Sequence, residues 1–585
     1  MNEHIKIPEG TPFNAIGHPV RRKEDARLLT GKGRFSDDFN IDGQVFMAVV
    51  RSPRPHARIV RIGTETAKKM KGVLAVLTGA EAAADGLQPL PHTPVPSTRY
   101  DMKLTAPGGG EVFAGPNVLL PQDKARYVGE AIAIVVGETK AQAMDGAEAV
   151  EVEYEDLPFV SHSEDALAKG APVIWDAVKD NVLVDTYFGD KAKTDAAFAA
   201  ADHVVKHEFN IARVTAVTME LRAALGHYDT KTDRYTLYAG SGGAVKQKQE
   251  IAGALGIAPR QLRILSFDVG GNFGARNRPY VEFGLVLWAS RKVGRAVKYT
   301  ATRSEAFLTD YQGRDLISKV ELAIRKDGKF LALRADNISN VGALCVSLSP
   351  LSKGSGLITG SYDIPAATLR ARAVFTNTMP TNAYRSSGRP EVTFAIERLI
   401  DLACVELGFD RVKLRRKNLV SAKKMPYRNA VGMVYDSGTY EANMDLAMRI
   451  ADWDGFKQRK KDAKKRGKLL GLGVANYLEG AGGAPRERAE VTIQPEGRTE
   501  LVLGTMNSGQ GHETSFAQLL NTWLGVPFET IDYVAHDTKR VAAGGGSHSG
   551  RSMRIASIAM GEASDQIIEK GKDIASHLLE AARGD

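Results

Sequence analysis

Hydrophobic and polar positions in the first 165 residues follow strand-like and helix-like patterns in turn. Residues 45–53 (VFMAVVRSP) predict a strand, and the wholly apolar stretch 131–137 (AIAIVVG) predicts a buried one. Residues 66–79 and 139–158 each predict a helix followed by a strand. The pattern predicts an α/β unit that ends between residues 160 and 180, where the helix-prone stretch SEDALAKG stops.

The middle of the chain, to about residue 450, mixes strand patterns with strong helices. Residues 391–409 predict an amphipathic helix that Gly408 caps. Its apolar stripe comprises Phe394, Leu399, Ile400, Leu402, Val405 and Leu407. The basic stretch 456–468 predicts a solvated helix leading to a linker, and the absence of interleaved aromatic residues disfavours a nucleic-acid patch. Residues 564–582 predict an amphipathic helix. Because strand and helix patterns occur together along the whole chain, the expected fold class is α+β.

The amino-acid composition excludes some classes of protein. Hydrophobic residues make up 43% and charged residues 25%, which is typical of a globular protein and excludes disordered and fibrous chains. The net charge of +9 is spread over a large surface and does not by itself indicate a nucleic-acid partner. Glycine is enriched, with 58 residues, which favours tight turns or loops whose backbone lines a ligand site.

Cysteine usage and the N-terminus favour a cytoplasmic protein. Cys345 and Cys404 are too few for a disulfide framework, a four-thiolate zinc site or an iron–sulfur cluster. The start of the chain has no apolar stretch of a secretory signal, and Arg21 and Arg22 precede charged residues. The uncharged run 337–352 is broken by serines and a proline, so no membrane span is expected.

The first of three glycine-rich loops lies in 263–279 (RILSFDVGGNFGARNRP). A strand pattern precedes Gly-Gly-Asn-Phe-Gly and a helix pattern follows, so backbone N–H groups there can approach a polar ligand. A Rossmann dinucleotide turn is disfavoured, because the spacing is wrong and strand 295–302 ends without the ribose-binding acid. A purely structural turn stays open.

Two further loops carry polar side chains suited to a cofactor. In 503–526 a strand leads to Gln510, whose amide offers a donor and an acceptor, and then to a helix start that favours anions. In 537–554 three consecutive glycines stand beside Ser547, Ser549 and Arg551, a set able to grip phosphate.

Hydrolytic sites are disfavoured. His203 and His207 have the spacing of a helical zinc pair, but their stretch alternates like a strand, which places them roughly 13 Å apart. No Gly-x-Ser-x-Gly elbow of a serine hydrolase occurs.

Taken in order, these motifs resemble the large, molybdenum-bearing subunit of the xanthine dehydrogenase and aldehyde oxidase family, nearest its bacterial carbon-monoxide-dehydrogenase-like branch. The matching stretches are 17–59, 219–225 (MELRAAL), 268–276 (DVGGNFGAR), 383–391 (AYRSSGRPE), 397–419, 509–518 (GQGHETSFAQ) and 536–552 (HDTKRVAAGGGSHSGRS). The resemblance implies an N-terminal α/β hammerhead-like domain (1–165), followed by mixed α/β molybdopterin-binding domains. The first part of these covers 166–450 and the second 451–585, the latter incomplete at its C-terminal end.

The resemblance also implies roles for individual residues. Phe273 and Arg385 lie beside the metal, and Ser386 and Ser387 shape the substrate pocket. Molybdenum is held by the pterin dithiolene and takes no side-chain ligand. The other residues implied in cofactor binding are Gly271, Asn272, Gly274, Gly509, Gln510, Gly511, His512, Asp537, Thr538, Ser549 and Arg551. The implied cofactor is molybdopterin cytosine dinucleotide with molybdenum.

The implied reaction is hydroxylation of an aldehyde or N-heterocyclic carbon with oxygen from water. Electrons then leave through 2Fe–2S clusters to FAD. Two cysteines cannot hold such clusters. A small iron–sulfur subunit and a medium FAD subunit are therefore expected as partners, with no nucleic acid.

The sequence departs from the family pattern in four places. Gly242 stands where the family has a glutamine near the metal, and Leu221 replaces a proline. Ser386 stands where copper-using carbon monoxide dehydrogenases have a cysteine, so copper-dependent chemistry is not expected. The family's catalytic glutamate follows a further C-terminal stretch. The nearest look-alike here, Gly561-Glu562, is expected before the last helix and on the surface.

Three functional hypotheses follow. The leading one is a molybdenum hydroxylase subunit, with its remaining C-terminal part supplied as a separate chain or lost. The second is a truncated or degenerate assembly subunit without turnover. The third is a nicotinamide dehydrogenase that binds NAD at the Gly-Gly-Asn-Phe-Gly loop.

Overall fold

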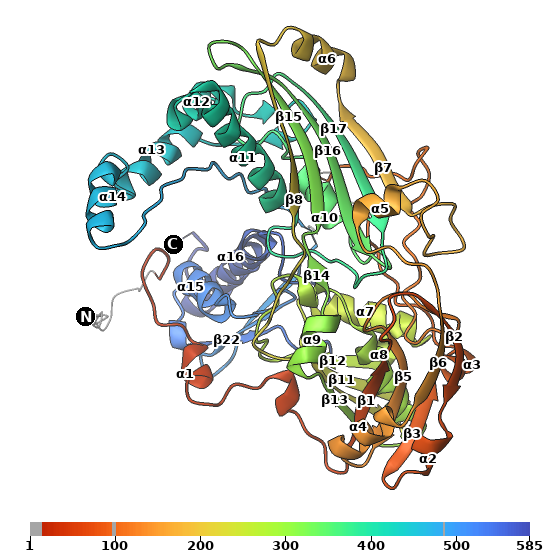
Figure 1. The fold of residues 1–585 in the computed structure, drawn as a ribbon. Coiled ribbons are helices and arrows are strands. Elements are labelled where there is room, and N and C mark those ends of the chain that lie inside the picture. The colour runs from red at the N-terminus through yellow and green to blue at the C-terminus, as the bar shows by residue number, and fades with distance from the viewer. Residues whose placement is uncertain (1–14, 96–100, 484–485, 585) are drawn as a thin grey trace.

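The computed structural model describes residues 15–95, 101–483 and 486–584, and it arranges them around two large sheets and two three-stranded ones (Figure 1). Helices and strands are mixed throughout, which confirms the predicted α+β class. Within these ranges, none of the helices has the length and apolar character that crossing a bilayer requires.

A seven-stranded sheet forms the lower body in Figure 1. Its strands, in spatial order, are β12 (Leu262–Leu265), β11 (Arg234–Ala239), β10 (Ala223–Asp229), β13 (Val297–Thr300), β1 (Val45–Arg51), β5 (Ala131–Gly137) and β3 (Val73–Thr78). Every residue of β5 is buried, as its apolar sequence predicts. Because β1 pairs in parallel with β13, the sheet takes strands from both sides of residue 165.

Helices cover this sheet and confirm the predicted pattern. The helix α8 (Val281–Val293) packs against β10 and is apolar on most of its surface, as expected of a buried helix. Gly226 permits this packing, because a β-carbon there would lie 2.7 Å from the backbone of Val286. The helices α4 (Lys140–Glu148), on β1 and β5, and α7 (Ala244–Ala254), on β12, complete the cover.

A three-stranded sheet lies beside the N-terminal strands. It contains β4 (Lys124–Ala125), β2 (Ala57–Gly63) and β6 (Glu151–Asp156). The short helices α2 (Glu65–Lys69) and α3 (Gly79–Ala84) pack against β3 of the seven-stranded sheet, and α5 (Ser163–Leu167) follows β6 in the chain. The helix–strand pairs predicted in 66–79 and 139–158 are thus confirmed as α2–β3 and α4–β6.

The second large sheet has five strands and forms the upper body in Figure 1. In spatial order they are β7 (Val182–Gly189), β17 (Ala366–Phe375), β16 (Phe330–Gly342), β15 (Leu316–Ile324) and β8 (His203–Ile211). The strand β8 contains both His203 and His207, which confirms that they do not share a helix face.

The helix α11 (Arg389–Leu407) covers one face of this sheet and ends at Gly408, which takes the left-handed conformation of a cap. Part of its predicted apolar stripe is wrong. Leu399 and Ile400 are buried as predicted, but Phe394 is 47% exposed and Val405 is 78% exposed, and the buried face includes Val392 and Ile396 in their place. The small helix α6 (Lys191–Ala199) packs against β16 and β17.

The C-terminal part of the chain forms the other three-stranded sheet and its helices. These elements are β20 (Ala489–Ile493), β21 (Thr499–Leu503), β22 (Ile531–Val534), α15 (His512–Leu524) and α16 (Arg551–Leu579). The placement of Gly561-Glu562 before the last helix is wrong, because α16 already begins at Arg551 and contains both residues. Glu562 is exposed, as expected.

Shorter elements connect these bodies. They are α1 (Asp25–Leu28), β9 (Val214–Thr215), α9 (Arg303–Thr309), β14 (Gln312–Gly313), α10 (Ser349–Ser355), α12 (Arg411–Asn418), β18 (Tyr427–Arg428), β19 (Val434–Tyr435), α13 (Tyr440–Ile450) and α14 (Phe456–Lys465). The basic helix α14 is largely exposed, which confirms the solvated helix predicted there.

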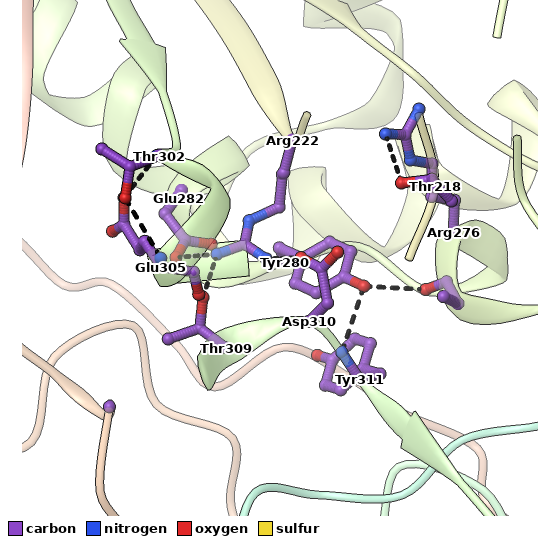
Figure 2. Close-up of polar contacts among 12 residues, drawn as sticks. Thr218, Arg222, Arg276, Tyr280, Glu282, Thr302, Glu305, Thr309, Asp310 and Tyr311 are labelled. Atoms are coloured by element: carbon purple, nitrogen blue, oxygen red, sulfur yellow. Dashed lines mark hydrogen bonds and ion pairs between the residues drawn. The ribbon is translucent and has the colours of Figure 1, made fainter. Parts of the chain in front are cut away.

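A buried ionic network ties the seven-stranded sheet to α8 and α9 (Figure 2). Arg222, directly before β10, donates to Glu282 (3.0 Å) and Thr309 (2.6 Å) and pairs with Asp310. Its guanidinium carbon lies 4.3 Å from the centroid of the Tyr280 ring. Burial alone would raise the pKa of Glu282, but the arginines that face it outweigh burial and hold that pKa at about 2.

We expect Arg222→Met to lower the free energy of unfolding by about 3–5 kcal/mol, because it removes the ion-pair partner of buried Asp310 and leaves buried Glu282 with Arg51 alone. Urea denaturation followed by circular dichroism measures the change. Arg58→Met is the control, since Arg58 pairs with Glu155 on the surface and its loss should cost less than about 1 kcal/mol. Equal midpoints for the two variants would contradict a stabilising network.

Candidate functional site

A cavity of about 1040 Å³ lies where four loops converge. These loops follow β12 (267–274), precede α11 (383–389), precede α15 (507–513) and precede α16 (547–552). Phe273, Arg385 and Gln510 all line it, although they are more than a hundred residues apart in sequence. Three glycine-rich stretches that are separate in the sequence thus form one site.

The Gly-Gly-Asn-Phe-Gly loop presents an aromatic ring to the cavity. Phe273 has a φ of 51° and remains 47% exposed. Asn272 turns inward, where its side chain accepts from the N–H of Gly274 (3.0 Å) and donates to Asn277 (2.9 Å). A β-carbon at Gly274 would lie 1.9 Å from the carbonyl oxygen of Ala383, so only glycine allows this loop to meet the next one.

Glu220, from the MELR stretch, supports the Gly-Gly-Asn-Phe-Gly loop through hydrogen bonds to its backbone. Its side chain is 7% exposed and accepts from the backbone N–H groups of Gly270 (2.8 Å) and Ser36 (3.0 Å). It also pairs with Arg276, which donates to Thr218 (3.2 Å; Figure 2). Sequence analysis did not assign Glu220 to the site, and the motif match over 219–225 was the only signal for it.

The loop before α11 has an unusual backbone. Arg385, Ser386 and Ser387 take φ values of 20°, 65° and 46°, a region that costs an L-residue roughly 1–2 kcal/mol each. The N–H of Arg385 donates to the carbonyl of Phe273 (2.8 Å), which joins the two loops. The side chain of Arg385 is exposed to the cavity, while the buried hydroxyl of Ser387 has no hydrogen-bond partner among the described residues.

Gln510 is engaged by its own loop. Its side-chain oxygen accepts from the N–H of Ser508 (2.5 Å), and its amide nitrogen donates to the carbonyl of Met506 (3.2 Å). Gly509 takes a φ of 102° and Gly511 a φ of 84°, which lets the loop turn into α15. As placed, the Gln510 amide shapes the loop that faces the cavity.

His512 begins α15 and is only 5% exposed. Burial lowers its pKa to about 4, so the ring is neutral at pH 7, and it stacks on Phe516 with 4.8 Å between centroids. Neither ring nitrogen has a hydrogen-bond partner in the described part of the chain, and the buried hydroxyl of Ser508 has none either. These polar atoms at the cavity wall fit a ligand that is rich in donors and acceptors.

Among the remaining predicted residues, Gly271 and Ser549 line the cavity, with φ values of 111° and 54°. Asp537 accepts from Arg263 at 2.9 and 2.6 Å. Thr538 accepts from the N–H of Ile264 (2.8 Å) at the end of β12. Both residues therefore fasten the segment around His536, which lines a neighbouring cavity of about 290 Å³.

Arg551 lies behind the cavity wall with its side chain fully buried. It pairs with Glu487 (2.9 Å) and donates to the carbonyl of Gly546 (2.6 Å). Glu487, whose side chain is 1% exposed, also accepts from Gly504 and Thr505. Sequence analysis missed Glu487, which no motif marked.

Gly242 occupies a tight contact between loops. A β-carbon there would lie 1.9 Å from the side-chain oxygen of Asn277 and 2.4 Å from the amide nitrogen of Asn272. Its carbonyl accepts from the N–H of Ser547 (2.8 Å). The position therefore holds the loops together, and a glutamine would fit only if the side chains of Asn272 and Asn277 moved.

Metal-binding side chains are scarce. Across the described ranges, no group of three or more His, Cys, Asp or Glu residues is arranged to hold a metal ion. Cys345 and Cys404 are both buried, and burial raises the pKa of Cys345 to about 12.

Comparison with known proteins gives a consistent result. Residues 30–158 match the model of the aldehyde oxidase and xanthine dehydrogenase a/b hammerhead domain, which confirms the predicted N-terminal fold. Residues 174–419 and 446–585 each match a molybdopterin cofactor-binding domain.

Individual relatives cover nearly the whole chain. It is 32% identical to the gamma subunit of the 6-hydroxypseudooxynicotine dehydrogenase complex of Paenarthrobacter nicotinovorans, over 99% of this chain and 72% of that protein. It is 32% identical to the carbon monoxide dehydrogenase large chain of Hydrogenophaga pseudoflava, over 100% of this chain and 75% of that one. The structure of quinoline 2-oxidoreductase from Pseudomonas putida 86 is similar at a TM-score of 0.89 and 33% identity, over 98% of this chain and 72% of that one.

We expect Gly242→Gln to lower the free energy of unfolding by about 1–3 kcal/mol, because the new side chain forces the loops apart. Gly473→Gln is the control, since Gly473 lies in a connecting stretch with no atom within 4 Å of an added β-carbon. Urea midpoints compare the two. A Gly242→Gln protein as stable as the control would show that the loops separate freely.

Acid should destabilise the protein through its buried histidines. Burial lowers the folded-state pKa of His512 and His548 to about 4, so the unfolded chain takes up protons first as the pH falls below 6.5. The stability that the neutral forms of these two histidines contribute is therefore fully present above pH 6.5, and it is lost as the pH falls to 4. We expect His512→Asn to weaken this loss and His227→Asn to leave it unchanged, as measured by melting temperature from pH 7.5 to 4.5. Identical profiles for the two variants would contradict this account.

Proposed function

This chain belongs to the xanthine dehydrogenase and aldehyde oxidase family of molybdenum-dependent oxidoreductases, in the branch of the carbon monoxide dehydrogenase large chains, and on that premise we propose that it hydroxylates an N-heterocyclic aromatic carbon with oxygen from water. An aldehyde carbon is the alternative substrate. The observation that carries the proposal is the single cavity shared by Phe273, Arg385 and the partnerless polar atoms of His512.

The cavity favours a flat aromatic substrate. Phe273 offers a half-exposed ring for stacking, and the exposed guanidinium of Arg385 offers hydrogen-bond donors to the same cavity. Ser386 has a hydroxyl where a copper site needs a thiolate, so carbon monoxide is not the proposed substrate. Relatives of this chain are named for quinoline and for a nicotine-derived compound, which supports the same substrate class.

The cavity also fits the family cofactor. We propose that His512 and Ser508, at the start of α15, donate to its anionic part, and that Ser549 binds from the opposite loop. When bound, the molybdenum cofactor supplies the oxidising centre and accepts two electrons. Phe273 and Arg385 then hold the substrate ring against that centre, while Ser386 and Ser387 shape the pocket around it.

We propose that the cytosine nucleotide tail of the cofactor binds in the neighbouring cavity of about 290 Å³. This cavity shares Asp268 and Glu513 with the main cavity and contains Arg27, Lys32 and Arg34. Asp537 and Thr538 contribute by fastening the His536 segment at its edge. Arg551 and Asn272 contribute by shaping loops, since their polar groups contact other parts of the chain.

Electron transfer requires partners. Cys345 is buried in the loop after β16 and Cys404 is buried on α11, and two thiols cannot hold an iron–sulfur cluster, so we propose that 2Fe–2S clusters and FAD reside on a small and a medium subunit in a cytoplasmic complex.

The test is to purify the chain with its co-expressed partners and measure bound metal and nucleotide. We expect about one molybdenum per chain, cytidine nucleotide on denaturation, and dye reduction with quinoline but not with carbon monoxide. Product formed in ¹⁸O-water should carry the label. Absence of both molybdenum and nucleotide would contradict the proposal.

We expect His512→Ala to lower molybdenum and nucleotide content about tenfold, because the ligand loses a charge-assisted donor at the start of α15. His227→Ala is the matched control, since His227 lies on β10 away from the cavity lining. Metal content by mass spectrometry and nucleotide content by chromatography give two independent readouts. Full loading of the His512 variant would remove this residue from the cofactor site.

A further inference from the structure

Four consecutive residues beside the cavity take left-handed backbone conformations. Arg385, Ser386, Ser387 and Gly388 have φ values of 20°, 65°, 46° and 87°. Only the last is a glycine, the residue that adopts such values without strain. A strained stretch of this kind persists only where its surroundings hold it in place.

Arg389 holds the middle of this stretch. Its side chain is 4% exposed and donates to the carbonyl of Ser386 (2.8 Å). Its other terminal nitrogen donates to the carbonyl of Gly480 (2.6 Å), and the guanidinium pairs with Glu479 (3.0 Å). The fork of one arginine thus joins the strained loop to the segment between α14 and β20.

Arg314 holds Arg385, the first residue of the left-handed stretch. It donates to the carbonyl of Arg385 (2.9 Å) and pairs with Glu391 (2.7 Å), whose side chain is 2% exposed. Its guanidinium carbon lies 5.1 Å from the centroid of the Tyr384 ring. Each of two successive carbonyls in the loop is therefore held by its own arginine, and each arginine is held by its own carboxylate.

Backbone contacts fix the two ends. The N–H of Arg385 donates to the carbonyl of Phe273 (2.8 Å). At the other end, Gly388 packs against the backbone of Pro350, and a β-carbon there would lie 1.7 Å from the carbonyl oxygen of Pro350. The turn into α11 therefore requires glycine at this position. Between these ends, the described structure offers the two guanidinium groups as the side-chain donors to the loop carbonyls of Arg385 and Ser386.

We infer that Arg389 and Arg314 are positioning residues that keep the side chains of Arg385 and Ser387 facing the cavity. Their donors are directed at loop carbonyls, so they act through the loop. Glu479 and Gly480 belong to a region distant in sequence, so the segment after α14 takes part in aligning the Arg385 loop. The catalytic consequence of this inference rests on the proposed function; the alignment itself does not.

Hydrogen–deuterium exchange of the purified chain tests the alignment without any need for bound cofactor. In Arg389→Met we expect the amides of residues 384–389 to exchange about tenfold faster, since loss of a charge-assisted hydrogen bond lets the loop open more often. Peptides from β15 and β16 should keep their exchange rates. Arg398→Met, on an exposed part of the same helix, is the matched control and should leave the loop unchanged.

Three outcomes decide the inference. Loop exchange in Arg389→Met no faster than in the control would overturn it. If Arg389→Met does not fold, Glu479→Gln replaces it, with an expected rise of about threefold and the same criterion. Arg389→Lys should restore overall stability but only part of the loop protection, because an ammonium group cannot reproduce the fork; full restoration would overturn the requirement for an arginine.

Turnover separates positioning from a general loss of stability. In the assembled complex with quinoline as the probe, Arg389→Met should lower kcat about tenfold and change KM less than threefold, since the substrate does not depend on this guanidinium for contact. A change confined to KM would overturn the positioning role. A complex that lacks molybdenum would contradict the proposed function and leave the exchange result standing.

Discussion

Buried pairs of carboxylate and guanidinium groups hold the cavity in shape. Its walls are loops, which have no regular backbone hydrogen bonding of their own. Glu220 with Arg276 and Glu487 with Arg551 compensate, because each buried carboxylate also accepts from backbone N–H groups of a neighbouring loop. A buried charge without its partner is costly, so such pairs fix the loops in one arrangement rather than several.

The shape of the cavity also depends on glycine, because glycine lets the backbones of two loops approach closely. Gly242 meets Gly546 where a β-carbon on the latter would lie 2.4 Å from the carbonyl oxygen of the former. Gly274 meets Ala383 in the same way. The high glycine content of the sequence thus has a structural explanation at the site, where backbones touch and side chains are left to face the ligand.

Hydrophobic period is a local signal and predicted most of the helices and strands, and glycine spacing indicated the loops around 270–274, 509–511 and 544–546. The roles of Phe273 and Arg385 followed from the family resemblance instead. The sequence could not predict which polar atoms the protein uses internally. The Gln510 amide and the Arg551 guanidinium suit a ligand when considered alone, yet hydrogen bonds within its own loop occupy the first, and an ion pair with Glu487 and a carbonyl occupy the second. Glu220, Glu487 and Arg389 show the converse, since their importance depends on partners far away in the chain.

The parallel pairing of Val45 with Val297 has a consequence for biosynthesis. While the ribosome is still producing the intervening residues, β1 lacks the neighbour on that side. At roughly 5–20 residues per second, this takes on the order of 10–50 seconds. An unpaired strand edge is open to pairing with other chains during that time. The newly made N-terminal segment therefore depends on chaperones, or on rapid pairing of β1 with β5, until β13 emerges.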